Sequence, residues 1–118
     1  MIRLFHGTQA KMAQSIIDFG VDSVKASECG SSGDFYTTVE PEVAAWYSKL
    51  SIHSPENGAP VIVGFDLEKQ TIDDWLQRSP TWIIDHFLDG IYQFLPRSHA
   101  TLNCKMTNVT LTYVDQGP

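Results

Sequence analysis

Three residues at the end of the first apolar run, His6, Gly7 and Thr8, carry groups that could hold a ligand. A histidine at a strand end can point into a cleft, and glycine lets a ligand approach the backbone because it has no Cβ atom. The amide and carbonyl of Gly7 could then bind an amide group, and Thr8 adds a hydroxyl. The alternative is a turn with a surface histidine and Thr8 as a helix N-cap.

Two tyrosines follow, Tyr36 in the segment GDFYTT and Tyr47 in AAWYS, with ten residues between them. The first falls on a predicted strand and the second on the helix after it. Two such rings can enclose a flat aromatic ligand, with stacking worth about 0.5–1.5 kcal/mol beyond the buried area. A cationic ring such as nicotinamide gains further from the π faces. The alternative is that both tyrosines are core residues.

A third feature is Gln93, a polar residue in the apolar run GIYQFL. Alternation along a strand places it on the face opposite to Tyr92 and Phe94. If that face borders the same cleft, the amide could hold a sugar hydroxyl. An outward-facing polar residue on a half-exposed strand is the alternative.

Strands and helices must position these groups. Apolar and β-branched runs predict about six strands, at residues 2–6, 21–26, 34–39, 61–67, 90–95 and 105–114. Helices are predicted at residues 11–19, 40–50, 71–77 and 81–88, with a solvated turn after Pro96. The first helix should bury a stripe and end at Gly20; the stripe comprises Met12, Ile16, Ile17 and Phe19. The pattern predicts an α+β fold rather than a regular βαβ alternation.

Composition narrows the class of protein. The 118 residues are 42% hydrophobic and 19% charged, which predicts one domain, residues 1–118, with its own core. A net charge of -6 argues against a broad nucleic-acid or anionic-membrane surface. Cys29 and Cys104 leave one disulfide or two reduced thiols open, and no metal-ligand spacing is evident, so no metal is expected. Without an evident signal peptide or membrane span, we expect a cytoplasmic protein, or an effector delivered into a cytoplasm.

Taken together, FHGT, the isoleucine-containing helix ending in Gly-Val, the Gly/Ser loop, DFYTT and the tyrosine ten residues on resemble one family. That family is the mono-ADP-ribosyltransferases of the diphtheria-toxin, or His-Tyr-Glu, type, with their small bacterial relatives. The resemblance is most specific over residues 3–50 and weaker through Val114. It implies two small, mostly antiparallel sheets in a split sandwich, with peripheral helices and NAD in the cleft between. The loop at residues 27–34 would border that cleft.

The resemblance also implies residue roles. His6 would bind the adenosine-side ribose and order the nicotinamide half of NAD, Gly7 would contact the carboxamide, and Thr8 would lie near adenosine. Tyr36 and Tyr47 would stack on nicotinamide. The implied reaction transfers ADP-ribose from NAD to a macromolecular acceptor, a protein in preference to a nucleic acid, and releases nicotinamide. An immunity or regulatory protein is a further expected partner.

At the family's third motif position, normally a glutamate on a late strand, Gln93 is the best match. His6, Tyr36 and Gln93 are therefore the candidate catalytic residues. A carboxylate at this position stabilises the positive charge that develops as nicotinamide leaves. An amide loses that charge, which could cost about 2 kcal/mol or more of transition-state stabilisation, roughly 30-fold or more in rate.

Other acids could compensate for this loss. Asp34 adjoins the Tyr36 motif, and Asp85 and Asp89 lie just before the strand of Gln93. Solvated surface acids are the simpler interpretation of all three. Two other functions therefore stay open: an NAD glycohydrolase without a specific acceptor, and a catalytically silent domain that binds a nucleotide or a partner protein.

Overall fold

The described strands form one antiparallel sheet in a computed structural model that describes residues 1–22, 33–50, 55–78, 82–86 and 89–114. The strands are β1 (Ile2–Gln9), β2 (Phe35–Thr38), β3 (Pro60–Leu67), β4 (Ile83–His86), β5 (Ile91–Phe94) and β6 (Thr107–Tyr113). The helices are α1 (Ala10–Phe19), α3 (Pro41–Ser48), α4 (Lys69–Arg78) and α5 (His99–Lys105), with 3-10 turns at Pro55–Asn57 and Pro96–Ser98. The predicted α+β class is confirmed.

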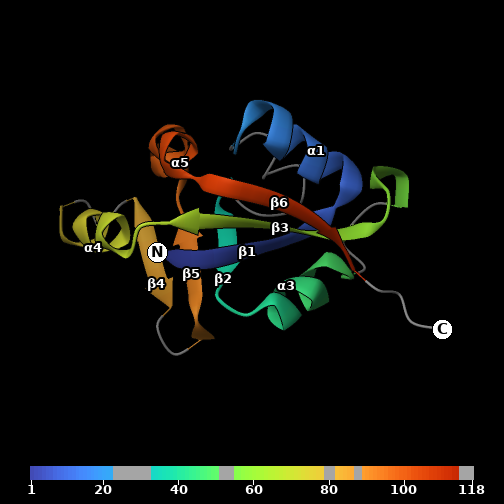
Figure 1. The fold of residues 1–118 in the computed structure, drawn as a ribbon, viewed down its shortest axis with the longest axis horizontal. Coiled ribbons are helices and arrows are strands. Elements are labelled where there is room, and N and C mark those ends of the chain that lie inside the picture. The colour runs from blue at the N-terminus through green and yellow to red at the C-terminus, as the bar shows by residue number, and fades with distance from the viewer. Residues whose placement is uncertain (23–32, 51–54, 79–81, 87–88, 115–118) are drawn as a thin grey trace.

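The sheet has two halves that diverge. Its strand order is β4-β5-β2-β1-β3-β6, and β1 pairs with β3 along all eight of its residues. Within the described residues, Phe5 with Thr38 is the one residue pair that joins β1 to β2. In Figure 1, β1, β3 and β6 run along the long axis of the molecule, whereas β2, β4 and β5 cross it. The two separate sheets that we expected are therefore corrected to one twisted sheet, whose halves stay linked through a single pair.

The core lies on one face of this sheet. Leu4 on β1 lies opposite Phe65 on β3, and both are fully buried. The same cluster continues into the second half of the sheet through Phe35, Ile83 and Phe94. Burial of these apolar side chains holds the halves together where hydrogen bonds between the strands are few.

Helices α1 and α3 cover opposite faces of β1 and β3. Ala13 of α1 packs against Val61 and Val63, which share a face with His6. Helix α3 lies against the other face, where a Cβ atom on Gly7 would overlap the backbone oxygen of Ala44. Figure 1 shows the two helices on either side of the strands.

Three sequence predictions are wrong in detail. The stripe on α1 is not fully buried, because Ile17 is 43% exposed and Phe19 85% exposed. The segment predicted as a helix at residues 81–88 contains β4, since pairing with β5 buries Ile83 opposite Phe94. The predicted turn after Pro96 is present and exposes Arg97, but it buries Ser98 and leads into α5, which begins at the buried His99. Most of the predicted strand at residues 21–26 lies outside the described residues.

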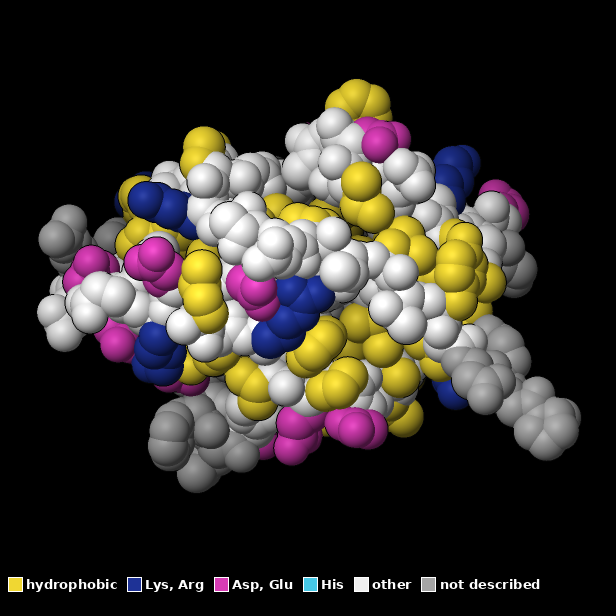
Figure 2. All heavy atoms as spheres, in the orientation of Figure 1, with side chains coloured by type: hydrophobic (Ala, Val, Ile, Leu, Met, Phe, Trp, Pro, Cys, Tyr) yellow, Lys and Arg dark blue, Asp and Glu magenta, His cyan; other side chains and the backbone are white. Residues whose placement is uncertain are grey.

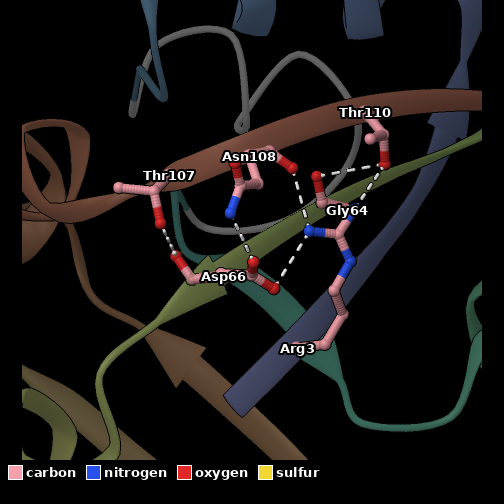
Figure 3. A network of polar contacts seen from close by, with 6 residues as sticks. All are labelled: Arg3, Gly64, Asp66, Thr107, Asn108 and Thr110. Atoms are coloured by element: carbon pink, nitrogen blue, oxygen red, sulfur yellow. Dashed lines mark hydrogen bonds and ion pairs between the residues drawn. The ribbon is translucent and has the colours of Figure 1, made fainter. Parts of the chain in front are cut away.

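A polar network fastens β6 to the sheet (Figure 3). The guanidinium of Arg3 donates to Asp66 Oδ1 at 3.0 Å, to the Asn108 carbonyl at 2.9 Å and to Thr110 Oγ1 at 2.7 Å. Asn108 Nδ2 donates to Asp66 Oδ2 at 2.8 Å. Hydrogen bonds from Asn108 and Arg3 hold the pKa of Asp66 below its ordinary value. Three strands are thus joined at the irregularity where the β3–β6 register shifts.

Candidate functional site

Tyr36 and Gln93 lie directly opposite each other on neighbouring strands. Tyr36 on β2 is the register partner of Gln93 on β5, which also pairs with Ile84 on β4. Register partners project from the same face of a sheet, so the three side chains form one row. Tyr36 is 42% exposed and Gln93 is 8% exposed. The row therefore presents an aromatic ring to solvent beside a nearly buried amide.

Both ends of the Gln93 amide are bonded to other side chains. Its Nε2 donates to Asp34 Oδ2 at 2.6 Å, and its Oε1 lies 2.9 Å from His86 Nε2. An ionised carboxylate only accepts hydrogen bonds, so the amide nitrogen faces Asp34 and the oxygen faces His86. Because that oxygen also only accepts, His86 Nε2 must carry a proton. Sequence reasoning missed His86, since its place beside Gln93 depends on the β4–β5 register.

His6 connects β1 to β2 just beyond their single residue pair. Its Nδ1 lies 2.7 Å from the backbone oxygen of Tyr36, and its ring centroid is 4.3 Å from that of Phe35. A carbonyl only accepts, so Nδ1 carries the proton in this arrangement. A regular ladder would continue from Phe5 and Thr38 to Gly7 opposite Tyr36. The His6 side chain instead bonds this carbonyl as the strands diverge.

The two predicted stacking residues are both partly exposed at the surface, Tyr36 on β2 and Tyr47 on α3. Tyr47 on α3 is 39% exposed, and the neighbouring Trp46 is 60% exposed and makes an edge contact with it at 5.1 Å. Partial burial raises the pKa of the Tyr36 phenol, and the charges of Asp34 and Tyr47 raise it further. The alternative that both tyrosines are core residues is wrong. Figure 2 shows hydrophobic side chains gathered over α3, with acidic side chains below them.

Gly7 and Thr8 have clear structural surroundings. Strand β1 continues through Gln9, which is the N-cap of α1, so the alternative of a turn after His6 with Thr8 as the helix cap is wrong. Thr8 is 2% exposed, and the space beside Gly7 is taken by Ala44 of α3. Their contacts with a ligand stay predictions.

The three acids near Gln93, which are Asp34, Asp85 and Asp89, have different surroundings. Asp34 is bonded to Gln93. Asp85 is the register partner of Tyr92 and therefore projects from the face opposite to Gln93. Asp89 is exposed after β4. Of the predicted loop at residues 27–34, only Gly33 and Asp34 lie within the described residues.

A groove of about 320 Å³ lies elsewhere, between α1 and the start of β6, and Figure 2 shows apolar side chains in this hollow. Its lining comprises Ile16, Ile17, Phe19, Gly20, Asn103, Met106 and Val109. The amide of Asn103 is bonded to the backbone of Val21 at both ends. This lining offers few groups for the phosphates and sugars of a dinucleotide. The predicted site residues His6, Tyr36, Tyr47 and Gln93 lie outside this lining.

Cys104 is exposed and free of a disulfide, whereas Cys29 lies outside the described residues. In the described part of the chain, no group of three or more His, Cys, Asp or Glu side chains could hold a metal ion. None of the helices described is long and apolar enough to cross a membrane.

Comparison with known proteins adds no relative. No family model, curated protein or solved structure matches this chain.

Proposed function

We propose that this chain is an NAD-dependent mono-ADP-ribosyltransferase with the nicotinamide half of NAD beside Tyr36 and Tyr47. The observations that carry the proposal are the 2.7 Å contact of His6 Nδ1 with the Tyr36 backbone oxygen and the pairing of Tyr36 with Gln93, at the point where the two halves of the sheet diverge. In the family that the sequence resembles, NAD lies in the cleft between two such halves. The described strands of this chain form one sheet, and the single described pair between β1 and β2 is the feature of that sheet that most resembles such a division.

Each group has a task in the proposed reaction. The rings of Tyr36 and Tyr47 enclose nicotinamide, whose positive charge in NAD favours aromatic faces. His6 orders the ribose, and Gln93 accepts a hydrogen bond from a ribose hydroxyl. The glycosidic bond to nicotinamide breaks, and its electron pair leaves with nicotinamide. The acceptor nucleophile then bonds the ribose carbon and loses its proton to solvent.

Labelled NAD tests this reaction. The protein is incubated with NAD labelled on the adenylate phosphate and with a cell extract. We expect nicotinamide release and a labelled protein acceptor, both reduced at least about tenfold in Tyr36→Ala because a stacking contact is lost. Tyr113→Ala is the matched control, since Tyr113 is 64% exposed on the distant β6. Unlabelled extract with no nicotinamide release would contradict the proposal, and labelled nucleic acid would change the acceptor class.

A second candidate is a catalytically silent NAD-binding domain. It is favoured by Gln93, which replaces a glutamate and has both ends of its amide bonded to Asp34 and His86. NAD binding without nicotinamide release would support this candidate. Free ADP-ribose formed in the absence of any acceptor would instead identify an NAD glycohydrolase. The main proposal, by contrast, includes an immunity or regulatory partner protein and a reaction that takes place in a cytoplasm.

A further inference from the structure

We propose that Asp34 is a positioning residue that supplies, through Gln93, the negative charge that a glutamine lacks. The inference rests on the proposed function and names how this chain would compensate for the missing family glutamate. Asp34, Gln93 and His86 would then act as one hydrogen-bonded unit, with Gln93 as the member that contacts the ribose.

The geometry of the unit carries the inference. The bond from Gln93 Nε2 to Asp34 Oδ2 is 2.6 Å long, as short as bonds to charged acceptors become. Gln93 is 8% exposed, and hydrogen bonds are electrostatically stronger in such surroundings than in water. At the other end, His86 Nε2 donates to Oε1 at 2.9 Å and prevents the amide from rotating.

Polarisation transmits the charge. A carboxylate that accepts from the amide nitrogen shifts electron density toward the amide oxygen, because successive hydrogen bonds polarise one another. Gln93 Oε1 has two acceptor positions, and His86 occupies one of them. The second can receive a ribose hydroxyl with an oxygen more negative than that of an ordinary amide. The pair of Asp34 and Gln93 thus places part of a negative charge where a glutamate would place a full one.

A second observation places the Asp34 charge beside Tyr36, on the sheet face from which Gln93 also projects. After partial burial, the charge of Asp34 is the largest cause of the raised pKa of the Tyr36 phenol. The same carboxylate therefore acts on the proposed nicotinamide-stacking residue and on Gln93. Asp85 projects from the sheet face opposite to Gln93, which makes it a suitable control acid.

A charge exchange between the two positions tests the inference. Asp34→Asn removes the charge, Gln93→Glu places two carboxylates in contact, and the double variant moves the charge to residue 93. In the full chain, we expect Asp34→Asn to lower kcat for nicotinamide release by about 30-fold, with KM for NAD within about threefold. The double variant should recover to within about threefold of the wild type, and Asp85→Asn should match the wild type.

Binding and folding are measured beside turnover. NAD calorimetry and thermal midpoints establish that each variant folds and binds. Nuclear magnetic resonance of the wild type adds an independent measurement: one Gln93 amide proton should lie well downfield because of its bond to a carboxylate. An ordinary position for that proton overturns the inference even if Asp34→Asn does not fold.

Two kinetic outcomes would also overturn it. One is full turnover in Asp34→Asn. The other is a double variant that folds and binds NAD but stays as slow as Asp34→Asn. Failure of the wild type to bind NAD is a different result, because it overturns the proposed function itself.

Discussion

The Nδ1 atom of His6 lies 2.7 Å from the backbone oxygen of Tyr36, one residue beyond the only described pair between β1 and β2. This bond satisfies a carbonyl that the diverging strands leave without a ladder partner in β1. It also ties the first predicted site residue to the second. The place where the sheet divides and the candidate site are therefore the same part of the molecule.

Replacement of His6 tests the structural side of this relationship. We expect His6→Ala to lower the free energy of unfolding by about 1–3 kcal/mol, because a hydrogen bond and the contact with Phe35 are both lost. His6→Phe keeps an aromatic ring against Phe35 and should lose only about 1 kcal/mol. Urea denaturation measures both values. Equal stability of the alanine variant and the wild type would contradict the role of this bond.

Gly7→Ala tests the close approach of α3 to β1. The added methyl would overlap the Ala44 oxygen, so α3 must move, and we expect a loss of about 1–3 kcal/mol in thermal unfolding. Gly64→Ala is the matched control on the same face of the sheet. There a Cβ atom would lie 3.0 Å from Thr110 Oγ1 and 3.1 Å from Arg3 Nη2, so these bonded side chains need to move by only a few tenths of an ångström, whereas the Ala44 backbone would overlap a Cβ atom on Gly7. Equal losses of stability in the two variants would contradict the prediction that the close approach of α3 to β1 makes Gly7→Ala the more costly substitution.

The pH dependence of stability tests the network around Asp66. Hydrogen bonds from Asn108 and Arg3 lower the pKa of Asp66 in the folded state. The Asp66 carboxylate therefore contributes to folding stability at pH values above its unfolded pKa of 3.8. That contribution is lost as pH falls through the lower folded pKa. We expect the melting temperature of the wild type to fall more steeply than that of Asp66→Asn below about pH 5. Parallel curves would contradict this prediction; Asp73→Asn, at an exposed ion pair with Lys69, is the control.

Titration of Tyr36 tests whether Asp34 and Tyr36 are neighbours. Partial burial and the Asp34 charge raise the pKa of the phenol. The difference between wild-type and Tyr36→Phe absorbance titrations isolates this tyrosine. In an Asp34→Asn background, the isolated curve should move to lower pH because a nearby negative charge is gone. An unchanged titration curve would contradict the proximity of Asp34 to the Tyr36 phenol.

Local patterns were sufficient for much of the fold. The apolar run at β3, the aromatic and β-branched run at β2, and Pro41 at the start of α3 predicted these elements because their signals lie in adjacent residues. Alternation also placed Gln93 on the face opposite to Tyr92.

The missed features depend on pairing between distant segments. Ile83 and Ile84 are compatible with a short helix, and only their pairing with β5 makes them a strand. The contact between His86 and Gln93 follows from that pairing, so no local sequence pattern predicts it. The sequence places Asp34 beside the Tyr36 motif, but the bond of Asp34 to Gln93 requires the β2–β5 register, which no local pattern specifies.

Calorimetric titration of NAD into the purified chain tests the central claim most directly. The account predicts saturable binding by the wild type and by Tyr113→Ala, with affinity at least about tenfold weaker in Tyr36→Ala. Absence of binding by the wild type, or equal affinity in Tyr36→Ala and Tyr113→Ala, would contradict an NAD site at Tyr36.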